Sequence, residues 1–460
     1  MLKKNDILTL PIESVNNLGY GVARHEGMAV FVSSAVTGDV AKVRILKVAK
    51  TWAAGKAETL VTPSPHRVAN TCPSRGCGGC AYRELDYGEE CRIKENDVRF
   101  AFRKAGVEAE VLPVVSAEKT DGYRNKAQYA VGDVGGKLVA GFFAPKSHRV
   151  VPAADCPLQP PAFARAVKVA LEYFNENKLT AYNEETGKGL LRHIYLRYSE
   201  AEEKILFTLV INGKALPDEW GFLCHLRANI PELSGILINE NKKSTNVVLG
   251  EKFRPIWGKD KLEDVLCGVR LSIAPDAFFQ VNRPAAELLY QKAKELAGLS
   301  GRELLWDLYC GAGSIGLYMA DACREVVGVE IVPSAVKNAE ENARQNSIVN
   351  ARFVVGDAST PETLLKNAFD ERGTRPDVVV LDPPRKGCSF ELLEYLASTL
   401  RVEKIVYVSC NPDTLARDAA ILLPLGYSLS PVTPVNLFPR TGHVESVVCL
   451  KRRLDVDMRR

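Results

Sequence analysis

The second half of the chain alternates short apolar runs with segments of helical spacing, and this rhythm restricts the fold more than any other feature. The apolar runs are ELLWDLY (303–309), EVVGVE (325–330), ARFVVGD (351–357), DVVVLD (377–382) and KIVYVSC (404–410). Strands that alternate with helices form parallel, doubly wound sheets, because each crossover helix covers one face of the sheet. Residues 272–460 are therefore predicted to form an α/β, Rossmann-like domain.

Each of these runs ends on or near a reactive side chain. Four carry a carboxylate, at Asp307, Glu330, Asp357 and Asp382, and the fifth ends at Cys410. Ligands of such sheets bind outside the carboxyl ends of the strands. The pattern predicts that these five side chains line one crevice.

The rest of the chain is long enough for two more domains. Residues 1–62 contain five short alternating strands split by Gly, Asn and Asp turns. This is typical of a small OB-type β-barrel that holds single-stranded nucleic acid, although a solvated barrel face explains the same pattern. An α+β central domain is expected over 63–271, with helices at 88–106 and 163–177 and strands at 190–199, 204–212, 235–241 and 245–250.

Composition narrows the class of protein. The 460 residues are 46% hydrophobic and 25% charged, without an apolar run of membrane length, so a cytoplasmic protein with no membrane partner is expected. The formal net charge of +4 permits a polyanionic partner without requiring one. Twelve cysteines stay reduced in the cytoplasm, which favours metal or catalytic roles over disulfides.

A glycine-rich turn follows the first strand of the Rossmann-like region, in DLYCGAGSIG (307–316). Such a turn fits NAD or S-adenosylmethionine, and a plain tight turn is a third interpretation. Glu330, at the next strand end, suits ribose hydroxyls in either ligand. Asp307 before the turn suits the cationic methyl donor better than a pyrophosphate, and Asp357 suits an adenine amino group. The pattern favours the methyl donor.

Two further strand ends decide which methyl acceptor is expected. In Asp382-Pro-Pro-Arg385 the prolines stiffen the loop and hold the acid in place. A similar acid-Pro-Pro-aromatic loop serves amine methylation, but Arg385 stands at the aromatic position. Cys410, before Asn-Pro, is either a small buried residue or a nucleophile. Methylation of an amine needs no thiol, whereas methylation of C5 of a pyrimidine does.

The chemistry of C5 methylation assigns roles to the remaining groups. A thiolate that adds to C6 makes C5 nucleophilic, and a base must later remove the C5 proton so that the thiolate is expelled. Arg385 is a candidate to favour the thiolate. Glu445, at the start of the last apolar run, is the expected base if burial raises its pKa, and His443 is the alternative.

A cysteine cluster lies between the barrel and the first long helix. Cys72, Cys77 and Cys80 stand in CPSRGCGGC, where the glycines permit tight turns around one metal centre. Both zinc and a [4Fe–4S] cluster accept such ligands. Cys91 and Cys156 are the candidates for a fourth ligand.

Together these motifs resemble the RNA uracil-5-methyltransferase family, in particular its iron–sulfur members that act on 23S ribosomal RNA. GYGVARHEGMAVFV is similar to the start of the TRAM domain of that family, and CPSRGCGGC and AADCPLQ to its cluster ligands. APDAFFQVN, DLYCGAGSIGL, LDPPRKG, VSCNP and HVESVV match its catalytic domain in order. The resemblance covers nearly the whole chain.

The resemblance implies an S-adenosylmethionine-dependent enzyme with Cys410 as nucleophile and Glu445 as base. It implies a [4Fe–4S] cluster on Cys72, Cys77, Cys80 and Cys156, and donor contacts from Gln280, Tyr309, Ser314, Glu330 and Asp382. The pattern of acidic strand ends adds Asp357 to these donor contacts. The expected product is 5-methyluridine in 23S rRNA, and the expected protein is a monomer. Methylation of tRNA uracil, and amine methylation of RNA or protein, are the alternatives.

Overall fold

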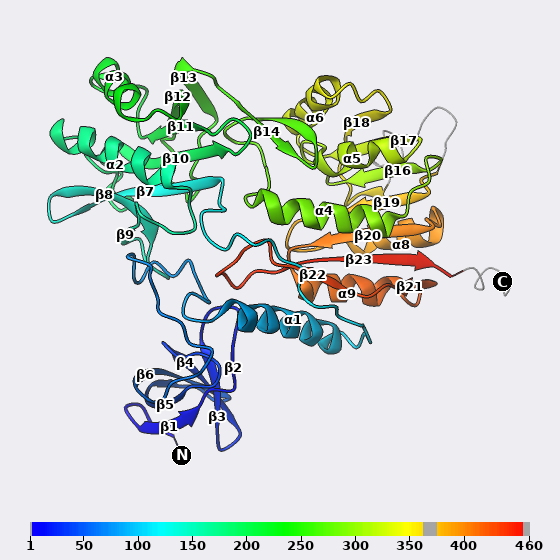
Figure 1. Ribbon diagram of the computed structural model, residues 1–460, viewed down its shortest axis with the longest axis horizontal. Helices are drawn as coiled ribbons and strands as arrows, with labels where there is room; N and C mark the ends of the chain where they lie inside the picture. Colours follow the sequence, from blue (N-terminus) through cyan, green and yellow to red (C-terminus); the bar gives the residue numbers. More distant parts are fainter. Residues whose placement is uncertain (1, 362–374, 454–460) are drawn as a thin grey trace. The chain divides into compact units, whose positions relative to one another are not determined.

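The structure is a computed structural model that describes residues 2–361 and 375–453. Its residues group into two compact units built from non-consecutive segments (Figure 1). Unit 1 contains Met1–Thr71, Gly79–Ala117 and Asp382–Arg460, and unit 2 contains Cys72–Gly78 and Glu118–Leu381. The expected division at 62 and 271 uses consecutive segments instead, and it stays a prediction.

The N-terminal segment of unit 1 forms a six-stranded sheet in the order β1-β5-β6-β4-β3-β2. The strands are β1 (Ile7–Pro11), β2 (Ser14–Val15), β3 (Gly21–His25), β4 (Met28–Ser33), β5 (Val40–Val48) and β6 (Trp52–Thr62). Alternate residues such as Val30, Val32, Val43 and Ile45 are fully buried in its core, as the period of two requires. The two outer strands in this order follow each other closely in the chain, so the chain itself links the edges of the sheet.

The rest of unit 1 consists of the long helix α1 and the C-terminal helices and strands. These elements are α1 (Tyr87–Lys104), α8 (Phe390–Glu394), a π-helical turn (Tyr395–Thr399), β20 (Lys404–Ser409), α9 (Pro412–Leu422), β21 (Tyr427–Leu429), β22 (Thr433–Val435) and β23 (Glu445–Arg452). Strand β23 pairs antiparallel with β20, β21 and β22. Helix α1 is the one expected at 88–106; its N-cap Asp86 accepts from the N–H of Glu89, and it lies beside α9 and β22 (Figure 1).

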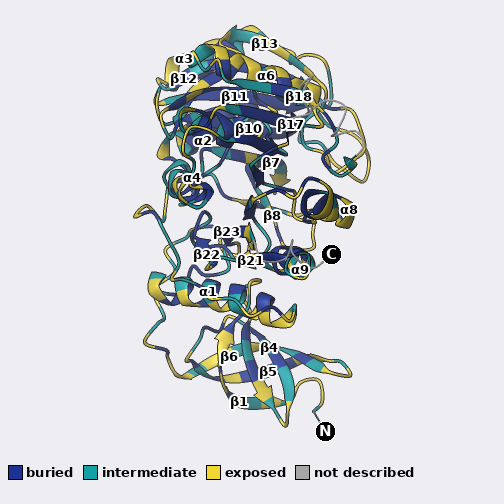
Figure 2. Cartoon of the chain, turned by 90° about the vertical axis from the view of Figure 1, so that its right-hand side faces the viewer, coloured by how far each residue is buried: buried dark blue, intermediate teal, exposed yellow. Residues whose placement is uncertain are grey.

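Unit 2 contains a seven-stranded sheet with helices packed on it. Its order is β13-β12-β11-β10-β7-β8-β9. Its elements are β7 (Lys126–Val134), β8 (Lys137–Phe143), β9 (Val150–Pro152), α2 (Pro161–Glu176), β10 (Leu191–Ser199), β11 (Lys204–Ile211), α3 (Glu219–Asn229), β12 (Leu233–Glu240) and β13 (Lys252–Gly258). Figure 2 shows β10 and β11 almost wholly buried, which explains why the sequence reads as continuous apolar runs there.

The strand predicted at 245–250 is wrong, because that segment is an irregular loop. The Asn241 side chain donates to the carbonyls of Val247 and Val248 (2.7 and 3.0 Å), and Arg192 donates to Thr245 (3.4 Å). Side chains thus take the acceptors that a neighbouring strand would use. The sequence TNVVLG alone does not reveal these side-chain hydrogen bonds to its carbonyls.

The remaining part of unit 2 shows the predicted strand–helix alternation. It contains a hairpin of β14 (Leu262–Leu266) and β15 (Val269–Ile273), then α4 (Arg283–Ala297), β16 (Leu304–Leu308), α5 (Ser314–Met319), a 3-10 turn (Ala320–Ala322), β17 (Glu325–Glu330), α6 (Pro333–Gln345), β18 (Ala351–Val355) and β19 (Val378–Leu381). The pairs β16–β17, β17–β18 and β16–β19 are parallel, so the α/β prediction is confirmed. None of the helices in the described part of the chain combines the length and apolar composition of a membrane-spanning segment.

Candidate active site

Cys410 lies in a tight turn between a buried strand and a helix. Strand β20 ends at Ser409, and Asn411 caps α9 by accepting from the N–H of Asp413 (3.1 Å). The Ser409 hydroxyl also accepts from the N–H of Asn411 (3.1 Å) and donates to its carbonyl (3.0 Å). The proline behind Asn411 starts the helix without a lost hydrogen bond. The thiol is therefore half-buried at a fixed strand end.

Strand register brings Glu445 to the same place from the other direction. In the antiparallel pair of β20 and β23, Ser409 lies opposite Ser446. Cys410 directly follows this pair and Glu445 directly precedes it, and burial together with the charge of Glu445 raises the pKa of Cys410. Glu445 is only 6% exposed. Nucleophile and base candidates are thus neighbours across two strands.

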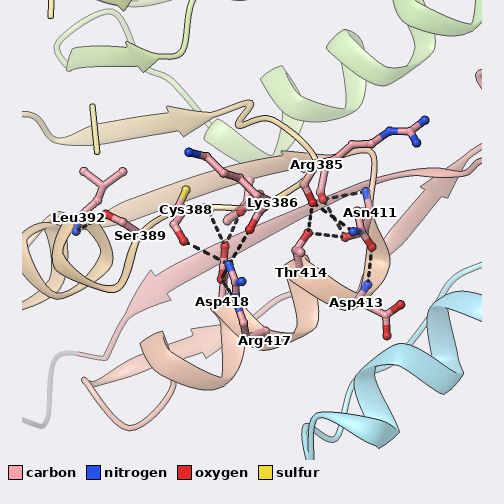
Figure 3. A network of polar contacts seen from close by, with 12 residues as sticks. Arg385, Lys386, Cys388, Ser389, Leu392, Asn411, Asp413, Thr414, Arg417 and Asp418 are labelled. Atoms are coloured by element: carbon pink, nitrogen blue, oxygen red, sulfur yellow. Dashed lines mark hydrogen bonds and ion pairs between the residues drawn. The ribbon is translucent and has the colours of Figure 1, made fainter. Parts of the chain in front are cut away.

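The Asp382–Arg385 loop is fastened to the turn that carries Cys410 (Figure 3). The Asn411 amide donates to the Arg385 carbonyl (3.1 Å), and the Thr414 hydroxyl approaches the same oxygen at 3.4 Å. Figure 3 also shows the Arg385 side chain extending away from this network. The Arg385 carbonyl therefore fixes the loop, while the exposed Arg385 guanidinium remains available to a ligand.

A buried carboxylate completes this fastening at the far end of the loop. Asp418, fully buried on α9, accepts from the Tyr407 hydroxyl (2.6 Å) and from the N–H of Cys388 (2.9 Å). Gly387 has φ 75°, and a Cβ there would lie 2.7 Å from Asp418 Oδ2 and 2.6 Å from Arg417 Nη2. Only glycine fits this position, which explains the sequence DPPRKG locally.

Burial shifts the three candidate reacting groups toward their neutral forms. Desolvation, followed by the charges of Glu445 and Asp382, raises the pKa of Cys410 to about 11, and Arg385 opposes this. Desolvation, then Asp382, raises the pKa of Glu445 to about 8. Desolvation raises the pKa of Asp382 to about 7. Arg385 favours the thiolate as expected, but it does not outweigh burial, so the thiol keeps its proton near pH 7.

His443 is placed differently from Glu445. Its side chain is exposed, and its Nε2 lies 3.3 Å from Nη2 of Arg385. Cys410, Arg385 and His443 all line one pocket of about 450 Å³. This volume lies within the range of small-ligand pockets, about 300–1,000 Å³.

The glycine turn in unit 2 carries the groups expected to contact the methyl donor. Glu330, at the end of β17, accepts from the N–H groups of Gly311 (3.1 Å) and Val332 (2.9 Å). Tyr309 has φ 65°, a left-handed conformation that non-glycine residues seldom adopt and that concentrates at ligand sites. The carboxylate and the turn are thus held together. The carboxylate oxygens suit ribose hydroxyls, and the turn suits an amino acid moiety.

Asp307 does not line a crevice, contrary to expectation. It is fully buried, and its Oδ2 accepts from the N–H of Gly316 (2.9 Å) beneath the turn. Its role in the structure is to hold the start of α5. The sequence did not distinguish this from a ligand contact, because a strand-end carboxylate can point either toward the ligand or beneath the turn.

The other expected donor contacts also belong to unit 2. The Ser314 hydroxyl shares a hydrogen bond with the Tyr290 hydroxyl (2.8 Å). Asp357 accepts from the N–H and hydroxyl of Ser359 (2.8 and 2.6 Å). Gln280 is 8% exposed, and the side-chain amide of Asn125 donates to the backbone carbonyl oxygen of Gln280 (2.8 Å). That these residues and Asp382 contact one donor molecule stays a prediction.

The expected cluster ligands are distributed over both units. Cys72, Cys77 and Cys156 belong to unit 2, and Cys80 belongs to unit 1. Burial raises the pKa of Cys156, and the thiols of Cys72 and Cys77 raise it further. In the described part of the chain, no group of three or more Cys, His, Asp or Glu side chains is arranged to hold a metal ion.

Known proteins similar to this chain are RNA methyltransferases. A family model described as tRNA (Uracil-5-)-methyltransferase matches residues 202–453. An uncharacterized RNA methyltransferase of Clostridium tetani is 38% identical over 98% of this chain and 97% of its own length. One of Halalkalibacterium halodurans is 36% identical over 98% of both chains. Among solved structures, Pyrococcus abyssi tRNA (uracil-54, C5)-methyltransferase in complex with S-adenosyl-L-homocysteine is similar, with a TM-score of 0.75 and 28% identity over 96% of this chain and 100% of that chain.

Proposed function

This chain belongs to the RNA uracil-5-methyltransferase family, whose members are enzymes that use S-adenosylmethionine, and we propose that it methylates C5 of a uridine through a covalent bond to Cys410. The observation that carries the proposal is the register of β20 and β23, in which Ser409 pairs with Ser446, so that Cys410 follows this pair and Glu445 precedes it. A nucleophile and a buried carboxyl side by side are what addition to C6 and proton removal from C5 require.

The residues act in a fixed order in this proposal. As the Cys410 sulfur bonds to C6, its proton passes to solvent and the C5–C6 electron pair makes C5 nucleophilic. S-adenosylmethionine supplies the methyl group that C5 takes up. Glu445 then takes the C5 proton, the electron pair of that bond restores the C5–C6 double bond, and the thiolate leaves. The raised pKa of Glu445 suits a base that works near neutral pH.

The donor would be held by Gln280, Tyr309, Ser314, Glu330 and Asp357 of unit 2 together with Asp382. The chemistry of these side chains supports this assignment. Glu330 accepts a hydrogen bond from the glycine turn, and carboxylates suit ribose hydroxyls and a cationic ligand. Substitution of any one of these side chains should therefore weaken binding of the methyl donor.

Ribosomal RNA of the large subunit is the proposed target, from the resemblance to the 23S rRNA enzymes. Transfer RNA is the second candidate, because the similar Pyrococcus abyssi enzyme acts on uracil 54 of tRNA. Mapping of 5-methyluridine in the rRNA and tRNA of cells with and without this gene separates them. The modified RNA loses its 5-methyluridine in the deletion strain.

The accessory parts complete the proposal. The N-terminal sheet, a TRAM-type barrel in residues 1–62, would bind RNA, and residues 63–271 would form the central domain. Cys72, Cys77, Cys80 and Cys156 would hold a [4Fe–4S] cluster, since four thiolates are its usual ligand set. The protein would be a cytoplasmic monomer. No step of the methyl transfer is assigned to the cluster.

A trapping experiment tests the catalytic core. RNA with 5-fluorouridine at the target position has no C5 proton to remove, so the enzyme and methyl donor should form a stable adduct through Cys410. Cys410→Ala should not form the adduct and should not methylate ordinary RNA. Cys388→Ala, which removes a nearby buried thiol, should form the adduct and should methylate ordinary RNA. If Cys410→Ala still transfers methyl groups, the alternative of amine methylation is favoured.

A further inference from the structure

Part of the wall of the pocket at Cys410 comes from elements without an assigned role. Besides Cys410 and its neighbours in the chain, α1 and the loop between β2 and β3 line it. On α1 the lining residues Asp97, Phe100, Ala101 and Lys104 are spaced by three, one and three positions. Residues at this spacing lie on one face of a helix. A helical stripe therefore faces the same pocket as the nucleophile.

Phe100 stands out on this stripe because its ring is 61% exposed. The neighbouring Phe102 is 1% exposed and supplies the buried side of α1. An exposed phenylalanine in a polar pocket offers a flat apolar surface for a planar partner. Nucleobases stack on such rings regardless of their identity.

Charged side chains of both signs line the same pocket as Phe100, namely Lys104 and Arg385 and the carboxylates Asp97 and Asp413. Lys104 pairs with Asp413 at the start of α9 (3.0 Å), but both side chains are more than 60% exposed, so this pair holds Lys104 only weakly. Arg385 lines the same pocket with an exposed guanidinium. Positive groups beside an aromatic ring match the phosphate and base of one nucleotide.

The loop between β2 and β3 is fixed in this wall by the catalytic segment itself. Gly442, three residues before Glu445, packs so closely that a Cβ there would lie 1.7 Å from the carbonyl oxygen of Asn17. The Asn16 side chain accepts from the N–H groups of Leu18 and Tyr20 (both 3.0 Å), which shapes the loop. Asn17 remains exposed at the pocket, with an amide suited to a base edge.

We propose that this outer part of the pocket binds the nucleotide next to the target uridine in single-stranded RNA. Its base stacks on Phe100, its phosphate meets Lys104 and Arg385, and Asn17 contacts its base edge. The assignment rests on the proposed function, because the uridine occupies the inner end at Cys410. It makes the N-terminal sheet part of the substrate site, through one loop.

Fluorescence of a modified base tests the stack directly. The probes are short single-stranded RNAs with one uridine and 2-aminopurine on its 5′ or 3′ side, titrated with the full-length protein at fixed salt. Wild type should quench one of them. Phe100→Ala should lose the quench and bind about 5- to 150-fold more weakly, the range for one base–aromatic stack. Phe390→Ala, which removes another exposed ring, and Phe100→Tyr, which keeps a ring, should behave as wild type.

Two further readouts separate this inference from the proposed function. Lys104→Met should lower the slope of log affinity against log salt by about one, since one phosphate contact is lost. If Phe100→Ala binds and quenches as Phe390→Ala does while methyl transfer to uridine proceeds, the subsite is refuted and the function stands. If the quench depends on Phe100 but no methyl group reaches C5, the subsite stands and the proposed function fails.

Discussion

A buried ion pair in α1 supports the segment that leads to Glu445. Lys94 and Glu90 are both fully buried, four residues apart on the helix. The Lys94 ammonium donates to Glu90 Oε1 (2.9 Å), to Asn436 Oδ1 (2.7 Å) and to the Phe438 carbonyl (3.1 Å). All three of its protons therefore have acceptors, two of them on the chain just before Glu445.

Lys94→Met should destabilise the protein strongly. Methionine keeps most of the side-chain volume but removes the charge, which leaves the buried Glu90 carboxylate with only the Arg440 guanidinium, 3.8 Å away, as a cation. Breaking a buried pair in this way costs about 3–5 kcal/mol of unfolding free energy. A unit of 150–250 residues shifts its melting temperature by about 2–4 °C per kcal/mol, so a fall of roughly 6–20 °C is expected. Methyl transfer should fall as well, because Asn436 and Phe438 lose their anchor.

Two variants show whether the buried charge causes this loss. Lys104→Met removes the same residue type from the same helix, but its pair with Asp413 is exposed, so it should cost at most about 1 kcal/mol. Glu90→Gln combined with Lys94→Met removes both charges. The amide oxygen introduced at position 90 can still accept from the Asn436 amide and the Arg440 N–H, as the carboxylate does, so the double variant should recover more than half of the loss. Urea and thermal unfolding followed by circular dichroism measure all three. Equal stability of Lys94→Met and Lys104→Met would refute the reasoning.

Three other predictions use separate parts of the structure. Because the pKa of Glu445 is raised to about 8 and that of Cys410 to about 11, both groups are protonated at lower pH, and kcat/KM measured from pH 6 to 9 should rise with pH throughout this range; a fall over that range contradicts their roles. Gly387→Ala should lower the melting temperature more than Gly136→Ala, since both adopt φ near 80° but only the former meets Asp418. Anaerobically purified protein should contain about four irons per chain by mass spectrometry, and Cys72→Ser should lose them; a full complement in that variant excludes Cys72 as a ligand.

Local signals in the sequence were sufficient for the α/β alternation and for the candidate nucleophile. Apolar periodicity depends only on neighbouring residues, so the strands β16–β20 and the helix α1 were predicted close to their observed bounds. Asn411 and Pro412 after a buried strand likewise predicted the turn at Cys410. The same reasoning failed at 245–250, where the side chains of nearby Asn241 and of Arg192, which is distant in the chain, donate to the carbonyls.

Tertiary structure decided how the separate motifs meet and how they are charged. The sequence determined that Cys410 and Glu445 stand at strand ends, but only the antiparallel register of β23 with β20, in which Ser409 pairs with Ser446, brings these two strand ends together, because pairing joins residues that are distant in the chain. Burial, which no local pattern specifies, raises the pKa of both groups. Asp307 is also buried, and its carboxylate accepts from the N–H of Gly316 in α5. The stripe of α1 that carries Phe100 was present in the sequence as a helix, and only the packing of α1 beside α9 made it a wall of the pocket.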